Sequence, residues 1–179
     1  MFYRRNRIAG GTFFITVVTN GRRPLLSTGR GRLCLRQALR DAGQRRPFDL
    51  PAFVLLPEHF HLLMRLPPGQ ENYSIRVAGI KRNFTDLFLA AGGQEGSVSQ
   101  GRQRKGYRGI WQPRFWEHTI RDAKDYKLHW ITYIPTRSST AWLGGPSNGH
   151  GRAFTGTCEW ENMIRIGAAT WSFRTTWNT

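Results

Sequence analysis

The sequence is poor in cysteine and in acidic residues, and it has no long hydrophobic run. Its two cysteines, Cys34 and Cys158, lack the paired short spacings of a zinc site or a disulfide framework. We interpret Cys34 as a small buried apolar residue and expect a reducing, cytoplasmic setting without a signal peptide. No stretch approaches the roughly 18 apolar residues of a membrane span. These features argue against a disulfide-stapled secreted domain and against an integral membrane protein.

The shortage of acidic residues leaves a large positive charge. Lys and Arg number 27 against 11 Asp and Glu, which gives a formal net charge of +16, more than solubility requires. A polyanionic partner is therefore expected, and nucleic acid is favoured over an anionic membrane surface. Composition alone leaves open a structural protein that binds RNA.

The first half of the chain alternates strand and helix signals. β-branched and aromatic residues followed by Asn-Gly predict a strand over 11–19. Apolar residues that include Leu33 then recur at helical spacing up to Gly43, which predicts a helix of about 13 residues. Two apolar runs, 48–56 and 60–66, predict antiparallel strands that meet near a pair of histidines.

The second half adds a helix, a basic linker, a strand and a further helix. The first of these helices is predicted from Tyr73, with Ile75 on its apolar face. Residues 92–109 offer little to bury, so we expect a mobile basic linker. A strand is predicted within 110–121, and Asp122 is placed to cap the helix that follows it.

Together these elements run strand, helix, strand, strand, helix, strand, helix. A small antiparallel sheet with helices on one face is an α+β fold of ferredoxin-like type. We place Trp111, Phe115 and Trp116 in the core rather than on a surface that stacks bases.

The triplet His59-Phe60-His61 is the sequence feature most informative about chemistry. Residues i and i+2 of a strand point to one face, so the two imidazoles can share a metal ion while Phe60 faces the core. Imidazoles suit Mg²⁺ or Mn²⁺ less well than carboxylates do, so such a site needs another oxygen ligand, which a DNA phosphate can supply. The pattern alone also fits two surface histidines on a strand.

Six motifs are spaced along residues 1–129. They are Tyr3-Arg4-Arg5, Gly10-Gly11-Thr12-Phe13-Phe14, Arg46-Pro47-Phe48, Leu55-Leu56-Pro57-Glu58-His59-Phe60-His61, Ile80-Lys81-Arg82-Asn83-Phe84-Thr85 and Ile110-Trp111-Gln112-Pro113-Arg114-Phe115-Trp116-Glu117-His118. In their types and order they resemble the REP-associated tyrosine transposases, which belong to the His-hydrophobe-His superfamily of single-strand endonucleases.

The resemblance implies a ferredoxin-like domain over 1–129 in which His59 and His61 hold a divalent metal, Mg²⁺ or Mn²⁺, at a phosphate of single-stranded DNA. A tyrosine on a late helix then attacks and forms a 5′-phosphotyrosine link. Family members recognise repetitive palindromic hairpins as monomers or dimers, so a DNA partner is expected and a homodimer is left open. The residues expected to contact DNA are Tyr3, Arg4, Arg5, Lys81, Arg82 and Arg114.

The chain departs from the family pattern after His129. Residues 125–129 keep the pattern, but the family continues with Val-Asp-Tyr-Ile and then Asn-Pro-Val-Lys-His-Gly, whose Tyr is the nucleophile and whose Asn is a further metal ligand. The nucleophile's position here holds Thr132. Tyr133 is the displaced candidate for the catalytic residue, one position late and about 100° away around a helix.

A shift of one base in the reading frame accounts for this departure. One base restored before the Trp130 codon TGG lets its last G join the AT of Ile131 as GAT, an obligatory Asp, and the later codons can spell the rest of the family motif. Residues 130–179 have no Lys, no Asp and no clear apolar period, so we expect an aberrant, poorly packed tail. We therefore expect a DNA transposition protein impaired in cleavage. The alternatives are a hairpin-binding module that does not cleave and an RNA-binding structural protein.

Overall fold

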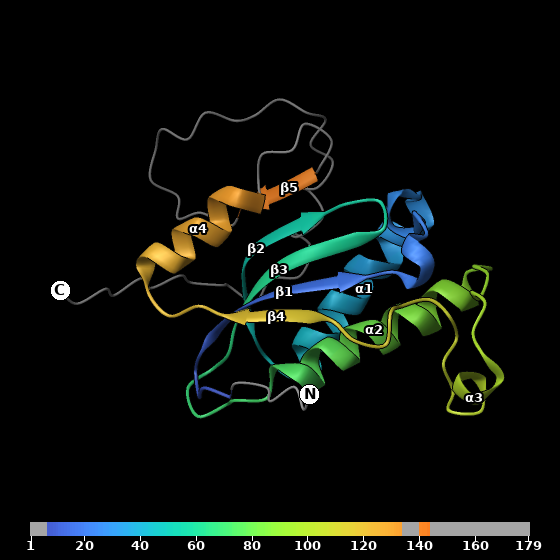
Figure 1. The fold of residues 1–179 in the computed structure, drawn as a ribbon, viewed down its shortest axis with the longest axis horizontal. Coiled ribbons are helices and arrows are strands. Elements are labelled where there is room, and N and C mark those ends of the chain that lie inside the picture. Colours follow the sequence, from blue (N-terminus) through green and yellow to red (C-terminus); the bar gives the residue numbers. More distant parts are fainter. Residues whose placement is uncertain (1–6, 134–139, 144–179) are drawn as a thin grey trace. The chain divides into compact units, whose positions relative to one another are not determined.

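The computed structural model describes residues 7–133 and 140–143, with side chains described up to residue 129. Its strands and helices are β1 Thr12–Val18, α1 Gly29–Arg45, β2 Asp49–Leu55, β3 His59–Arg65, α2 Tyr73–Ala90, α3 Gln100–Gln103, β4 Trp116–Thr119, α4 Ala123–Tyr133 and β5 Thr140–Leu143. The predicted order of strands and helices is confirmed (Figure 1). No helix in these ranges is long and apolar enough to cross a lipid bilayer.

The five strands form one antiparallel sheet in the order β4-β1-β3-β2-β5. The connection β1-α1-β2-β3-α2-β4 is the ferredoxin-like pattern, so the predicted fold class is confirmed. β5 adds an edge strand beside β2, within the segment expected to pack poorly. The remainder of that segment, 134–139 and 144–179, lies outside the described residues.

Alternate residues of each strand separate the two faces of the sheet. α1 and α2 cover one face as predicted, and there Phe13 of β1 packs on Tyr73 of α2 with ring centroids 4.3 Å apart. The other face has its own small apolar cluster, made of Phe14, Ala52, Leu63, Ile120 and Tyr126. Because Tyr126 belongs to α4, this helix covers the face opposite α1 and α2 (Figure 1), a feature that the expectation of helices on one face did not include.

Helix α1 is longer than predicted, and one residue of its predicted apolar face is exposed. The helix begins after Thr28, whose Oγ1 accepts a hydrogen bond from the Gly31 backbone N–H at 2.9 Å. Cys34 and Leu35 are buried as expected for the core side, but Leu33 is 58% exposed. Two residues span about 200° of a helix, so Leu33 lies on the side away from Leu35.

Helix α2 shows the same effect at its start. Ile75 is 39% exposed, whereas Val77, two residues later, is fully buried. Its place on the predicted apolar face was therefore wrong, because the helical turn carries it away from the buried stripe. The N-cap is Asn72, whose Oδ1 accepts from the Ile75 backbone N–H at 3.2 Å.

The predicted strand within 110–121 is realised only as β4, Trp116–Thr119. Trp111 is buried as predicted, and its indole N–H donates to the Lys81 carbonyl at 3.1 Å. Phe115 is partly buried. Trp116 is 50% exposed, so its predicted core position was wrong. It lies on β4, the edge strand of the sheet formed by the described residues.

The segment 92–109, predicted as a basic mobile linker, contains the short helix α3, and none of residues 92–108 is buried. Hydrogen bonds attach the segment to the rest of the domain. In one of them Asn20 Nδ2 donates to the Ser97 carbonyl at 3.1 Å. The two sides of the segment cross at Gly96 and Gly109, where a Cβ on Gly96 would lie 2.1 Å from the Gly109 carbonyl oxygen. Only glycine permits this crossing. Mobility of the segment beyond this point stays a prediction.

Candidate metal and nucleic-acid site

His59 and His61 lie on β3, on the face of the sheet that α4 covers. Their ring centroids are 4.8 Å apart, as two residues spaced i, i+2 on a strand allow. Phe60 points to the opposite face, where it is fully buried and packs on Phe53 and Trp111 at centroid distances of 5.5 and 5.8 Å. The predicted division of the triplet between the two faces agrees with this packing.

Each of the two imidazoles has an oxygen beside its Nδ1 atom. Thr16 Oγ1 lies 2.8 Å from His61 Nδ1, and Glu58 Oε1 lies 3.1 Å from His59 Nδ1. When Nδ1 holds the ring proton, such an oxygen fixes the ring and leaves Nε2 as the atom that coordinates a metal. A carboxylate is the partner that metal-ligating histidines often have. The two side chains can therefore serve as ligands of a divalent cation through Nε2.

Burial sets the charge state of His61. The side chain is 8% exposed, and burial, with a smaller contribution from neighbouring His59, lowers the pKa of His61 to about 4. The imidazole is therefore neutral at neutral pH, and neutral imidazole is the form that binds metal.

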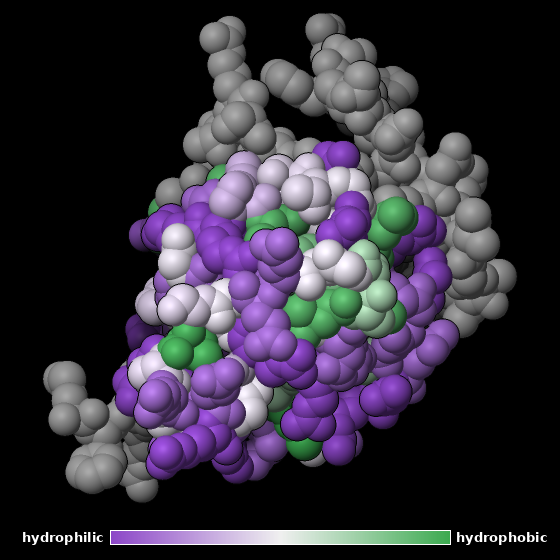
Figure 2. Space-filling model, turned by 90° about the vertical axis from the view of Figure 1, so that its right-hand side faces the viewer, coloured by the Kyte–Doolittle hydropathy of each residue, from purple (hydrophilic) through white to green (hydrophobic). Residues whose placement is uncertain are grey.

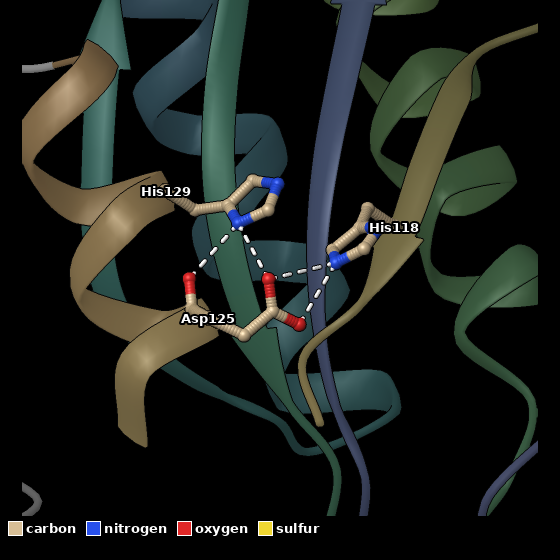
Figure 3. Close-up of side chains that lie close together, drawn as sticks. All are labelled: His118, Asp125 and His129. Carbon is tan, nitrogen blue, oxygen red and sulfur yellow. Dashed lines mark hydrogen bonds and ion pairs between the residues drawn. The ribbon is translucent and has the colours of Figure 1, made fainter. Parts of the chain in front are cut away.

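A second group of metal-binding side chains lies on the same face of the sheet (Figure 3). His118 comes from β4, and Asp125 and His129 lie one turn apart on α4. His118 Nε2 is 2.9 Å from Asp125 Oδ2, and His129 Nδ1 is 3.1 Å from Asp125 Oδ1. The two imidazoles stack with centroids 4.3 Å apart. One ligand atom from each residue can be chosen so that all three lie within 4.8 Å of one another.

This group was not among the site residues predicted from the sequence. The available signal was the spacing of Asp125 and His129, since residues i and i+4 share a helix face. Burial alone would raise the pKa of Asp125. The hydrogen bonds from His118 and from the Arg121 backbone N–H, with the nearby charges of His118 and His129, hold that pKa below its usual value.

Phe14 joins the two histidine groups. Its ring centroid is 5.4 Å from that of His61 and 5.2 Å from that of His129. His118 is the residue opposite Phe14 in the register of β1 and β4, so it shares the same face. The four histidines among the described residues therefore gather on one side of the sheet.

The residues predicted to contact DNA have different surroundings. Lys81 Nζ donates to the Gln112 carbonyl at 2.7 Å and so fastens the loop before β4 to α2. Arg82 and Arg114 are exposed. The remaining three, Tyr3, Arg4 and Arg5, lie outside the described residues. Phosphate contact by any of the six stays a prediction.

The displaced tyrosine is the last residue of α4. Thr132 precedes it, and the backbone of this helix is described to Tyr133. α4 therefore carries position 132, where the family resemblance predicts a nucleophile, and it lies on the face that holds His59 and His61. The role of this position stays a prediction.

Comparison with known proteins gives the family. No family model matches the chain. It is 41% identical over 132 residues to the REP-associated tyrosine transposase of Escherichia coli (strain K12). The aligned residues cover 74% of this chain and 68% of that protein. The chain belongs to the REP-associated tyrosine transposases. A relative in Haemophilus influenzae (strain ATCC 51907 / DSM 11121 / KW20 / Rd) with the same family name is 39% identical over 137 residues, covering 75% of this chain and 76% of the relative.

A solved structure of a REP-associated tyrosine transposase bound to a REP hairpin has the same fold. It matches with a TM-score of 0.56 at 41% identity and covers 72% of this chain and 67% of that one. The family predicted from the six motifs is confirmed, and so is its ferredoxin-like fold class.

The surface of this transposase around α3 is strongly hydrophilic. The face shown in Figure 2 is dominated by hydrophilic side chains, with hydrophobic ones in small separate patches. Exposed basic residues of the α3 segment include Arg102, Arg104 and Lys105. A surface of this kind suits a polyanion better than an apolar protein partner.

Proposed function

We propose that this transposase binds hairpins of single-stranded palindromic DNA and holds a divalent cation, Mg²⁺ or Mn²⁺, at His59 and His61. The observation that supports the cation site is the histidine pair itself. The two imidazoles share one sheet face, 4.8 Å apart, and each has an oxygen at Nδ1. A cation bound there supplies Lewis-acid polarisation of a DNA phosphate.

The proposed DNA partner rests on charge and on a relative. The net charge of +16 favours a polyanion, and a family member at 41% identity has been solved bound to a REP hairpin. Arg82 and Arg114 are exposed and able to reach phosphates. Lys81 holds the loop that contains Gln112, so we infer that it acts on DNA contacts mainly by positioning this loop.

We further propose that this chain cleaves DNA poorly. The position that the family pattern gives to the nucleophile holds Thr132, and Tyr133 is one position later, a step of about 100° around a helix. A threonine hydroxyl at its ordinary pKa is a weak nucleophile. The proposed function of this chain is therefore recognition of hairpins, and the cation site at His59 and His61 is retained.

A binding and cleavage experiment tests the proposal. Purified protein is titrated into a labelled palindromic DNA hairpin, a scrambled single strand and the RNA hairpin of the same sequence. We expect the DNA hairpin to bind most tightly and its affinity to fall steeply with salt. Equal affinity for the RNA hairpin would instead support the RNA-binding alternative.

Cleavage is tested with the same hairpin and Mn²⁺, with covalent adducts located by mass spectrometry. We expect almost no adduct on the unmodified chain, and an increase of at least tenfold in the double variant Thr132→Tyr/Tyr133→Ile, which restores the family's Tyr-Ile pair at these two positions. Tyr133→Phe is the matched control and should change nothing. Robust adducts on Tyr133 would refute impaired cleavage, and the nucleotide sequence around codon 130 checks the reading frame directly.

A further inference from the structure

We propose that His118, Asp125 and His129 form a second cation site, which takes a borderline divalent metal such as Zn²⁺ and fixes helix α4 to strand β4. This site has its own ligands and does not require metal at His59 and His61. It goes beyond the proposed function, which needs one cation only.

The ligand atoms have the chemistry and spacing of a metal site. Asp125 Oδ2 lies 2.9 Å from His118 Nε2, and Asp125 Oδ1 lies 3.1 Å from His129 Nδ1. Bonds of about 2.0–2.2 Å to one zinc ion place neighbouring ligand atoms roughly 3–3.5 Å apart. The two distances to Asp125 are close to this spacing, and with all three ligand atoms within 4.8 Å of one another, side-chain rotation has to bring the two imidazole nitrogens to it. Two imidazoles and one carboxylate favour zinc-like metals over Mg²⁺.

The carboxylate is already oriented for this role. Asp125 Oδ2 accepts the Arg121 backbone N–H at 3.0 Å, which fixes the carboxylate from outside the cluster, as outer partners do for metal ligands. In the metal-free protein the ring N–H of His118 can donate to the Asp125 carboxylate, and the Nδ1–H of His129 can donate to the Asp125 backbone carbonyl at 3.0 Å, with Oδ1 3.1 Å away, as Figure 3 shows. A cation takes the place of these two protons, and the rings move them to their opposite nitrogens.

The site joins strand β4 to helix α4. α4 rests on the sheet through the small cluster in which Tyr126 packs near Phe14, and its first turn is closed by Asp122. The cluster of His118, Asp125 and His129 is partly sheltered, with side-chain exposures of 28%, 16% and 13%. A cation there bonds β4 to α4 while water completes its coordination. It thereby fixes the helix that ends beside the nucleophile's position.

Metal titration of the full chain tests the inference. Protein stripped with EDTA is titrated with Zn²⁺ by calorimetry and with Co²⁺ by visible absorption. In the variant His59→Ala/His61→Ala we expect one Zn²⁺ per chain, a Co²⁺ spectrum with nitrogen and oxygen ligands, and a melting temperature that rises with Zn²⁺. Adding Asp125→Asn or His118→Gln to this variant should weaken Zn²⁺ binding at least tenfold and remove the rise.

Asp122→Asn, placed in the same background, is the matched control. It makes the same chemical change three residues away and keeps an effective N-cap, so Zn²⁺ binding should be unchanged. Circular dichroism without metal checks that each variant is folded, and His118→Gln serves if Asp125→Asn is not. The inference is overturned if the His59→Ala/His61→Ala variant binds no Zn²⁺, or if neither triad substitution weakens binding. Loss of Mn²⁺ binding in the His59→Ala/His61→Ala variant, with its Zn²⁺ binding retained, supports the first site separately.

Discussion

The two faces of the sheet are built from alternate residues of the same strands, and they differ in the side chains that they carry. On the α1 and α2 face, Phe13, Phe60 and Met64 are fully buried among apolar neighbours. On the α4 face, the four described histidines gather around Phe14, with an acidic side chain in each group. Because successive residues of a strand point to opposite faces, adjacent residues such as Phe13 and Phe14 lie in the two different environments. One face therefore stabilises the fold, and the other is available for chemistry.

Removing a large side chain from the closed face should have the largest effect. Phe60→Ala empties a fully buried position against Phe53 and Trp111, and we expect a loss of about 3–5 kcal/mol in the free energy of unfolding. Leu128→Ala, at a position on α4 that is 63% exposed, is the control and should cost under about 0.5 kcal/mol. Urea denaturation measures both. Similar losses in the two variants would remove the distinction between the faces.

In the metal-free protein, lowering the pH should reduce the folding stability through His61, on the α4 face of the sheet. The pKa of His61 falls from its ordinary 6.5 to about 4 on folding. Between these values the unfolded chain binds a proton that the folded chain does not, so stability decreases as the pH is lowered from 6.5 to 4. The loss approaches about 1.4 kcal/mol for each pH unit, roughly 3 kcal/mol in all.

Denaturation at several pH values in EDTA measures this slope. His61→Gln, which cannot titrate, should flatten it across the same window. Because the depressed pKa of Asp125 removes stability at a lower pH, the remaining acid sensitivity should appear below the His61 window. A slope between pH 6.5 and 4 that is unchanged in His61→Gln contradicts the role of His61 burial.

Local patterns were sufficient to predict one part of this site. The spacing of His59 and His61 on an apolar strand determines that both share a face, because strand alternation depends only on neighbouring residues. The succession of strands and helices along the chain follows from the same kind of periodicity. These elements and the family motifs could therefore be assigned without a structure.

Tertiary packing was required for the other part. The sequence of α4 does not determine which face of the sheet the helix packs on. The contact between His118 and Asp125 could therefore not be predicted. Exposure of Leu33 and Trp116 was missed for a related reason. An apolar residue predicts burial only when something packs over it, and β4 is an edge strand.

The hydroxyl of Thr16 allows a finer test of the histidine pair. Thr16→Val keeps the side-chain shape but removes the oxygen 2.8 Å from His61 Nδ1. Outer partners of this kind contribute about 10–100-fold to metal affinity, so Mn²⁺ binding should weaken by about that factor. Thr12→Val on the same strand is the control. Calorimetry with Mn²⁺ measures both, and equal affinities would exclude a role for Thr16 in orienting the imidazole.

The smallest effect we expect concerns how firmly α4 closes the histidine face. Asp122 Oδ1 accepts the Asp125 backbone N–H at 2.8 Å, and Asp122→Ala should cost about 1 kcal/mol while Asp122→Asn costs little. Because α4 is a terminal element of the described domain, packed on the sheet through the partly buried Tyr126, we expect the loss to appear as local opening. Hydrogen exchange should quicken in 123–133 but not in α1 or α2. Uniform acceleration across all three helices would show instead that α4 unfolds only with the whole sheet.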